Sequence, residues 1–131
     1  VYRLREKSNR ETNFSYIYEK NKNILSSISY YKTILNKNIN GLLLGPLAVD
    51  PEHRGKGYGV ELVKCSISII RETMDYEFIL VVGNYDYYEK FGFQKIDQTI
   101  DFYGPVNSNN VLILDVKHKL KINNFKTMEF N

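Results

Sequence analysis

The apolar residues in the first third of the chain follow patterns typical of β-strands. Stretches that mix aromatic and β-branched residues favour strands, and clusters of Asn, Lys and Gly favour the turns between them. We therefore predict strands over residues 14–18, 24–35 and 42–49, separated by turns at residues 19–23 and 36–41. Because the last strand is continuously apolar, we expect it to be buried on both faces. The charged residues 1–11 are interpreted as the end of a helix.

The spacing of apolar residues changes after residue 59. Intervals of three and four residues predict an amphipathic helix of about four turns, with its apolar stripe formed by Val60, Val63, Ile67, Ile70 and Met74. A buried strand, a short helix that ends at Gly92, and two more strands are then predicted over residues 78–82, 85–90, 94–100 and 111–116. This order of elements predicts a mixed α/β fold around one central sheet, in a single domain over residues 1–131.

Charge and composition narrow the possible partners. The 131 residues include 18 basic and 15 acidic ones, which are interleaved and leave a net charge of +3. A nucleic-acid-binding protein would instead gather its basic residues on one face, so we expect no nucleic-acid partner. No apolar run reaches the roughly 20 residues of a membrane span, and no secretory leader is recognisable, so we expect a cytoplasmic protein without a membrane partner. The single cysteine, Cys65, leaves no intramolecular disulfide.

The most informative segment is the glycine-rich turn that follows the predicted strand 42–49. Gly55, Gly57 and Gly59 permit left-handed backbone conformations, which let successive N–H groups converge on one point. The helix that follows adds unpaired N–H groups and the positive end of its dipole. Arg54 and Lys56 add two full positive charges. The turn therefore predicts a binding site for an anion.

Two nucleotide-binding motifs fail on spacing. A P-loop requires Ser or Thr directly after Gly-Lys, whereas Gly57 follows Lys56. A dinucleotide fingerprint requires glycines in the pattern G-x-G-x-x-G, and position 60 is Val. The anion is therefore expected to belong to a different cofactor, and no metal-ligand spacing is present.

Two motifs resemble the GNAT superfamily of N-acetyltransferases. Arg54, Gly57 and Gly59 occupy the fixed positions of the family's pyrophosphate loop, with Gly55, Lys56 and Tyr58 in its variable positions. The approach Leu47–Glu52 is similar to the end of the family's fourth strand. The segment Tyr87–Phe93 resembles the end of its fourth helix, and Tyr88 takes the position of the motif's tyrosine. A bacterial subgroup shares the paired Tyr-Tyr before Phe-Gly-Phe, but it has Asp at the position of Asn84.

The resemblance implies a GNAT fold that binds acetyl-CoA and uses no metal. Such a fold has a mostly antiparallel sheet whose fourth and fifth strands splay apart around the pantetheine arm, and Gly45-Pro46 is consistent with a distorted fourth strand. The cofactor would be bound by the residues Leu47, Ala48, Val49, Arg54, Gly55, Lys56, Gly57, Tyr58, Gly59, Asn84 and Tyr87. The Leu47 or Ala48 amide would stabilise the oxyanion. Tyr88 would protonate the departing thiolate, with Tyr87 as the alternative proton donor.

The sequence identifies neither the general base nor the acceptor amine. Glu52 and His53 are expected to face solvent beside the loop, Asp50 to cap the turn before Pro51, and His118 to lie at the surface. Cys65 is interpreted as a partly buried structural thiol.

Residues 1–6 resemble the end of the family's second helix, so the preceding strand and helix are expected to be missing, and residues 117–131 form a terminal extension. We therefore predict an N-acetyltransferase that transfers the acetyl group directly to a primary amine. The alternative is a module that binds CoA without turnover. Exposed strand edges would offer a surface for a homodimer.

Overall fold

The computed structural model describes residues 2–10, 13–35, 38–96, 101–102, 111–118 and 127–130. The chain divides into two compact units. Unit 1 consists of Val1–Tyr31 and Gly45–Met74, and unit 2 consists of Lys32–Leu44 and Asp75–Asn131. Two long strands, β3 (Asn23–Leu35) and β4 (Ile39–Val49), contribute residues to both units. Each unit is described below by itself.

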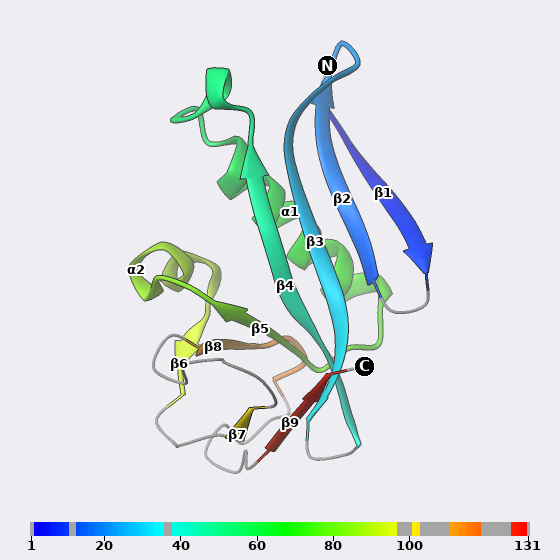
Figure 1. Cartoon of the computed structure of the whole chain (residues 1–131), viewed down its shortest axis with the longest axis vertical. Helices are drawn as coiled ribbons and strands as arrows, with labels where there is room; N and C mark the ends of the chain where they lie inside the picture. Colours follow the sequence, from blue (N-terminus) through cyan, green and yellow to red (C-terminus); the bar gives the residue numbers. More distant parts are fainter. Residues whose placement is uncertain are drawn as a thin grey trace. The chain divides into compact units, whose positions relative to one another are not determined.

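Unit 1 contains an antiparallel set of strands in the order β1, β2, β3 (Figure 1). β1 (Tyr2–Arg10) pairs with β2 (Asn13–Lys20), and β2 pairs with β3 in a register that places Phe14 opposite Tyr30. The β2–β3 turn uses left-handed conformations at Asn21 and Lys22, with φ angles of 52° and 68°. The predicted strands at residues 14–18 and 24–35 are therefore confirmed.

The prediction of a helix end at residues 1–11 is wrong, because residues 2–10 form β1. Tyr2 and Leu4 alternate with Arg3 and Arg5, which is the period of a strand. Pairing with β2 also supplies the backbone hydrogen bonds that a helix would otherwise make internally. The tertiary partner thus overrides the local propensity of this charged segment.

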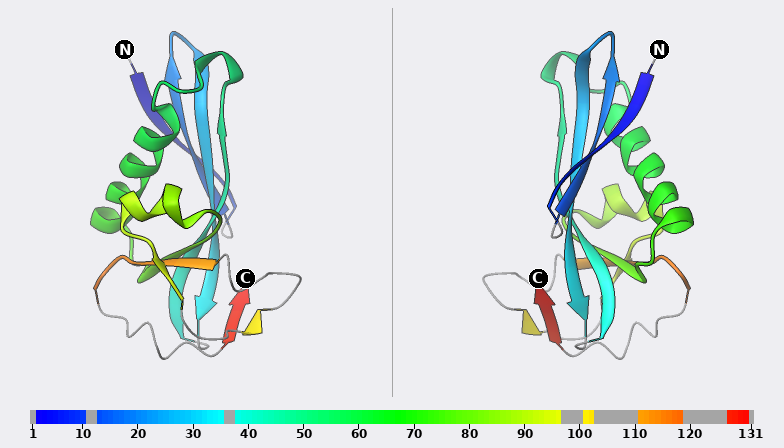
Figure 2. Two further views of the ribbon diagram at one scale, coloured as in Figure 1. Left: turned by 90° about the vertical axis from the view of Figure 1, so that its left-hand side faces the viewer. Right: turned by 90° about the vertical axis from the view of Figure 1, so that its right-hand side faces the viewer.

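The helix α1 (Tyr58–Thr73) lies across one face of the strands of unit 1 (Figure 2). Its buried residues are Leu62, Val63, Ser66, Ile67 and Ile70. They meet an aromatic cluster on β2 and β3, in which Phe14 and Tyr30 stack at 5.6 Å between ring centroids. The Tyr30 hydroxyl and the Ser66 hydroxyl are 2.8 Å apart, which fixes α1 against β3. The predicted amphipathic helix is confirmed, but its buried face differs in part from the predicted stripe, because Leu62 and Ser66 are buried and Met74 follows the end of the helix. No helix in the described part of the chain is long and apolar enough to cross a membrane.

Unit 2 is built around β5 (Phe78–Val82). β5 pairs in parallel with residues 41–43 of β4 and antiparallel with β8 (Val111–Asp115), which in turn pairs with β6 (Gln94–Lys95). At another edge, β9 (Thr127–Phe130) pairs with residues 33–35 of β3 and with β7 (Asp101–Phe102). Two short helices, α2 (Tyr85–Tyr88) and η2 (Glu89–Phe91), follow β5. One cluster of its core consists of Leu35, Phe78, Leu80, Val111 and Ile113.

The mixed α/β class is confirmed, whereas several boundaries differ from the prediction. Residues 39–41, expected in a turn, belong to β4, and residues 36–37 lie outside the described residues. The strand expected over residues 94–100 is limited to Gln94–Lys95, with residues 97–100 outside the described part. The expected burial on both faces of β4 is not found throughout: Leu42 and Leu44 on one face are buried, Leu43 on the other face is partly buried, and Pro46 and Ala48 are exposed. The apolar run therefore passes from a core into a surface environment.

Close packing of β4 on β5 gives the first testable prediction. A Cβ atom on Gly41 would overlap the ring of Phe78, which is completely buried. We expect Gly41→Ala to lower the free energy of unfolding by about 1–3 kcal/mol, as overpacking does in a well-packed core. Urea denaturation followed by circular dichroism measures this change.

Gly45→Ala is the matched control in the same strand. A Cβ atom there would meet the ring of Tyr31, whose side chain is 39% exposed and has room to move. We expect a smaller loss than for Gly41→Ala. Equal losses in the two variants would contradict the assignment of Gly41 as the tighter contact.

Candidate functional site

The predicted anion-binding turn connects β4 to α1 in unit 1. It begins with a short helix, η1 (Pro51–His53), which Asp50 caps by accepting a hydrogen bond from the Glu52 N–H at 3.4 Å. The Asp50 N–H donates to the Leu25 carbonyl at 2.8 Å, which attaches the turn to β3. The expected capping role of Asp50 is confirmed.

His53 lies closer to the protein than predicted. Its Nδ1 is 2.8 Å from the Asp50 Oδ2, and its side chain is only 30% exposed. This hydrogen bond is the largest of the influences that hold the pKa of the exposed Asp50 carboxyl below its usual value. Glu52, by contrast, is exposed as expected. The structure thus gives His53 a local partner in Asp50.

Two of the three glycines of the turn have the predicted left-handed backbone, whereas Gly59 is a buried residue of the first turn of α1 and its φ is not positive. The φ angles are +81° at Gly55 and +84° at Gly57, and a Cβ atom built on either residue would have no neighbour within 4 Å. Arg54 and Lys56 are exposed on the same turn, and neither forms an ion pair with a residue that the structure describes. The turn therefore combines accessible backbone with two positive charges.

The N-terminus of α1 opens directly onto this turn. Gly57 is the N-cap residue, and no side chain caps the helix there. The first helical hydrogen bond runs from the Glu61 N–H to the Gly57 carbonyl at 2.9 Å. The N–H groups of the first turn consequently have no helical acceptor, and they add to the positive end of the helix dipole. An anion is the natural ligand of this arrangement.

Residues that the sequence analysis did not single out hold the start of α1. The Ser26 hydroxyl donates to the Tyr58 carbonyl at 3.2 Å. The Tyr58 ring lies 6.1 Å from that of Tyr18 and 5.9 Å from that of His53. No sequence motif marks Ser26 or Tyr18, because their role depends on the strand pairing that brings β2 and β3 beside α1.

Strand β4 approaches the turn through Leu47, Ala48 and Val49. Its pairing with β5 covers only three residues of each strand and ends at Leu43 opposite Leu80, two residues before Gly45. Beyond this point, Ala48 is exposed and Leu47 and Val49 are partly exposed. The end of the ladder agrees with the strand distortion expected at Gly45-Pro46.

The second motif forms α2 and η2 in unit 2. The Asn84 side chain accepts a hydrogen bond from the Asp86 N–H at 2.8 Å, and the Asn84 carbonyl accepts from the Tyr88 N–H at 3.2 Å. Gly92, with a φ of 99°, ends the segment in the left-handed region, as predicted. Asn84 is thus the cap of α2, a role that an Asp side chain would also perform.

Tyr88 is half-buried against neighbouring rings. Its ring lies 5.0 Å from that of Tyr87 and 5.7 Å from that of Phe93, and it contacts the backbone of Gly83. Burial, and secondarily the neighbouring Tyr87, raises the pKa of the Tyr88 phenol above its usual value. Burial likewise raises the pKa of Tyr87. Both phenols therefore stay protonated at neutral pH, as a proton donor must.

The remaining candidates lie apart from these motifs. Cys65 is partly buried in α1, and its Sγ donates to the Glu61 Oε1 at 3.6 Å. Burial, and then the negative charge of Glu61, raises the pKa of this thiol, which suits a structural residue better than a nucleophile. His118 is exposed, as predicted. The predicted cofactor-binding residues 47–49 and 54–59 belong to unit 1, and Asn84, Tyr87 and Tyr88 belong to unit 2.

A strand, a left-handed glycine turn and an uncapped helix are typical of domains that bind a phosphate-bearing cofactor. Residues 11–95 match the family model of the acetyltransferase (GNAT) domain. The chain therefore belongs to the GNAT acetyltransferase family, as its motifs implied. The resemblance of its paired tyrosines to a particular bacterial subgroup stays a prediction. A comparison with curated protein sequences found no match.

Solved structures with a similar fold carry the cofactor expected for this family. YhbS, a GNAT family N-acetyltransferase from Escherichia coli in complex with CoA, has a TM-score of 0.77 and 16% identity, over 90% of this chain and 67% of that one. A GNAT family acetyltransferase from Brucella melitensis in complex with acetyl-CoA has a TM-score of 0.69 and 18% identity, over 90% and 66%. The chain thus spans about two thirds of the length of these proteins, and at this identity the likeness shows the fold.

A third similar structure bears on the expected partners. It is the KacTA–DNA complex, with a TM-score of 0.63 and 18% identity, over 83% of this chain and 71% of that one. Because a protein of this fold occurs in an assembly with DNA, the expectation that nucleic acid is excluded as a partner has no support.

Proposed function

We propose that this chain is an N-acetyltransferase that transfers the acetyl group of acetyl-CoA directly to a primary amine. Membership of the GNAT acetyltransferase family supports acetyl transfer, and the CoA and acetyl-CoA in two similar structures support the donor. The observation that carries the proposal is the turn at Gly55–Gly57, where left-handed glycines, two exposed cations and an uncapped helix start coincide. We assign the pyrophosphate of the cofactor to this turn.

The proposed reaction makes one bond and breaks one. The amine nitrogen attacks the thioester carbonyl carbon, a C–N bond forms, and the C–S bond breaks to release CoA. A free alkylamine with a pKa near 10.4 is mostly protonated at neutral pH, so its ammonium form loses one proton to bulk water before the attack. The nitrogen loses a second proton to water as the amide forms. The thiolate of CoA gains a proton, which we assign to the Tyr88 hydroxyl. Its raised pKa keeps this group protonated at neutral pH.

Other groups would stabilise the charge that develops during the transfer. We assign the oxyanion of the tetrahedral intermediate to the backbone N–H of Leu47 or Ala48, in the part of β4 beyond its pairing with β5. Asn84 and Tyr87 are proposed as further cofactor contacts. We assign no side chain as general base, because residues 42–49 contain no carboxylate.

The proposal is tested in two steps. Isothermal titration of acetyl-CoA into the purified chain measures cofactor binding, and we expect a saturable heat with one site. A thiol-reactive dye then reports CoA release with a panel of primary amines, and we expect release that depends on the amine. Absence of cofactor binding to a folded sample would refute the proposal. Binding without release for any amine would instead favour a CoA-binding module without turnover.

A further inference from the structure

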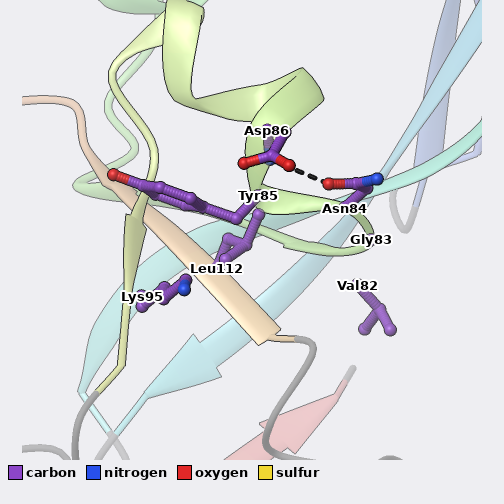
Figure 3. Close-up of a pocket in the computed structure, with 7 residues that line it drawn as sticks. All are labelled: Val82, Gly83, Asn84, Tyr85, Asp86, Lys95 and Leu112. Carbon is purple, nitrogen blue, oxygen red and sulfur yellow. Dashed lines mark hydrogen bonds between the residues drawn. The ribbon is translucent and has the colours of Figure 1, made fainter.

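Unit 2 contains a cavity beside the second motif, and Asn84, a proposed cofactor contact, is one of the residues that line it. It has a volume of about 490 Å³ and lies between the end of β5, the start of α2 and the strands β6 and β8 (Figure 3). Cavities of about 300–1,000 Å³ are the usual size for small-molecule sites. The residues that line it are Val82, Gly83, Asn84, Tyr85, Asp86, Lys95 and Leu112.

Two opposite charges border this cavity. Asp86 comes from α2 and Lys95 from β6, and both side chains are exposed. The Lys95 Nζ lies 4.8 Å from the centre of the Tyr85 ring, a cation–π contact that positions the ammonium at the wall. Within the described ranges, neither Asp86 nor Lys95 forms an ion pair. Both charges therefore remain available to a ligand.

The cavity adjoins the proposed proton donor through a single glycine. Gly83 lines the cavity and also contacts Tyr88, since a Cβ atom on Gly83 would lie 2.7 Å from the Tyr88 Cε2. A ligand in the cavity would consequently sit beside the backbone on which the Tyr88 ring rests. Nearness to Tyr88 is one requirement of an acceptor site under the proposed function.

We infer that the cavity binds the acceptor amine, and that this amine also carries an anionic group, a carboxylate or a phosphate. Lys95 would bind the anionic group, and Asp86 would attract the ammonium form of the amine before it loses its proton. The inference rests on the proposed function. It also implies selectivity, because Lys95 repels a polyamine and Asp86 repels a ligand that carries only negative charge.

The test is a series of amino acids with matched monoamines. Glycine, β-alanine, 4-aminobutyrate and 5-aminovalerate differ in chain length, and each is compared with the amine that lacks its carboxylate. O-phosphoethanolamine against ethanolamine tests the phosphate. We expect at least one anionic amine to bind the protein in isothermal titration, and to exceed its matched monoamine at least about tenfold in kcat/KM for CoA release, as a charge contact that the bound ligand shields from water would give.

Variants test whether the charges of Lys95 and Asp86 determine the affinity for the amine. We expect Lys95→Gln and Asp86→Asn each to raise the Kd of the anionic amine at least about tenfold. Lys90→Gln is the matched control, because the Lys90 Nζ makes a similar contact 4.5 Å from the Tyr87 ring but does not line the cavity. It is expected to leave that Kd unchanged.

The outcomes distinguish this inference from the proposed function. Absence of binding for every anionic amine, with or without bound acetyl-CoA, would overturn the inference. The same conclusion follows if Lys95→Gln has no effect, or if the monoamines are acetylated equally well. If only acetyl-CoA fails to bind, the proposed function is refuted. Binding of the anionic amine in the cavity is not refuted by that result, since it is measured separately on the free protein.

Discussion

Gly57→Val is expected to raise the Kd of acetyl-CoA at least about 100-fold, which corresponds to about 2.8 kcal/mol. Two effects act together. The φ angle of +84° at Gly57 is strongly unfavourable for a β-branched residue. The added side chain would also project into the open space in front of the turn, where no protein atom lies within 4 Å and where we place the pyrophosphate. Isothermal titration with acetyl-CoA measures the loss.

A second substitution separates strain from obstruction. Asn tolerates left-handed backbone better than other non-glycine residues, so Gly57→Asn retains the obstruction with less strain. We expect it to weaken binding as well, while circular dichroism melting shows that both variants stay folded. If the Gly57→Val protein is folded and binds acetyl-CoA with unchanged affinity, the assignment of the pyrophosphate to this turn is refuted.

Tyr88→Phe is expected to lower kcat by about 100-fold and to leave the Kd of acetyl-CoA within about twofold, because general acid catalysis contributes at least this much in many enzymes. The ring still packs against Gly83 and Phe93, so only the hydroxyl is lost. Steady-state CoA release and isothermal titration supply the two quantities.

The pH dependence of kcat tests the role of the Tyr88 hydroxyl independently. Burial raises the pKa of Tyr88 above the usual value near 10. A proton donor is active below its pKa, so the wild-type rate should fall only above about pH 10, and this limb should be missing in Tyr88→Phe. Tyr87→Phe is the comparison variant. A larger loss of kcat there than in Tyr88→Phe would assign the proton to Tyr87.

The sequence predicted best where one local signal determines the conformation. The stripe of Val60, Val63, Ile67, Ile70 and Met74 predicted α1 from its helical spacing. The three central members are buried, whereas Val60 is partly buried and Met74 follows the end of the helix. Gly55 and Gly57 predicted the left-handed turn, since few other residues adopt that backbone without strain. These two features carry most of the candidate cofactor site, and both can be recognised in a single sequence.

Features that depend on distant partners were missed. β1 was interpreted as a helix, because a charged segment acquires its strand conformation from pairing with β2. The change of environment within β4, from buried Leu44 to exposed Pro46, has no counterpart in its uniformly apolar sequence. The cavity was not predicted either, because Asp86 and Lys95 are nine residues apart in sequence and line one cavity only in the folded unit.

The interleaving of the two units along the chain has a consequence for expression of fragments. Residues 32–44 of unit 2 lie in sequence between the two segments of unit 1, so no contiguous fragment contains either unit alone without residues of the other. A protein that ends at Met74 would hold all of unit 1 together with Leu35, Leu42 and Leu44, side chains that are buried in the complete chain. Without β5 and β8, part of their cover is gone, and exposed apolar strands promote aggregation. Deletions from the carboxyl end are therefore a poor way to isolate the cofactor turn, whereas point substitutions in the whole chain preserve it.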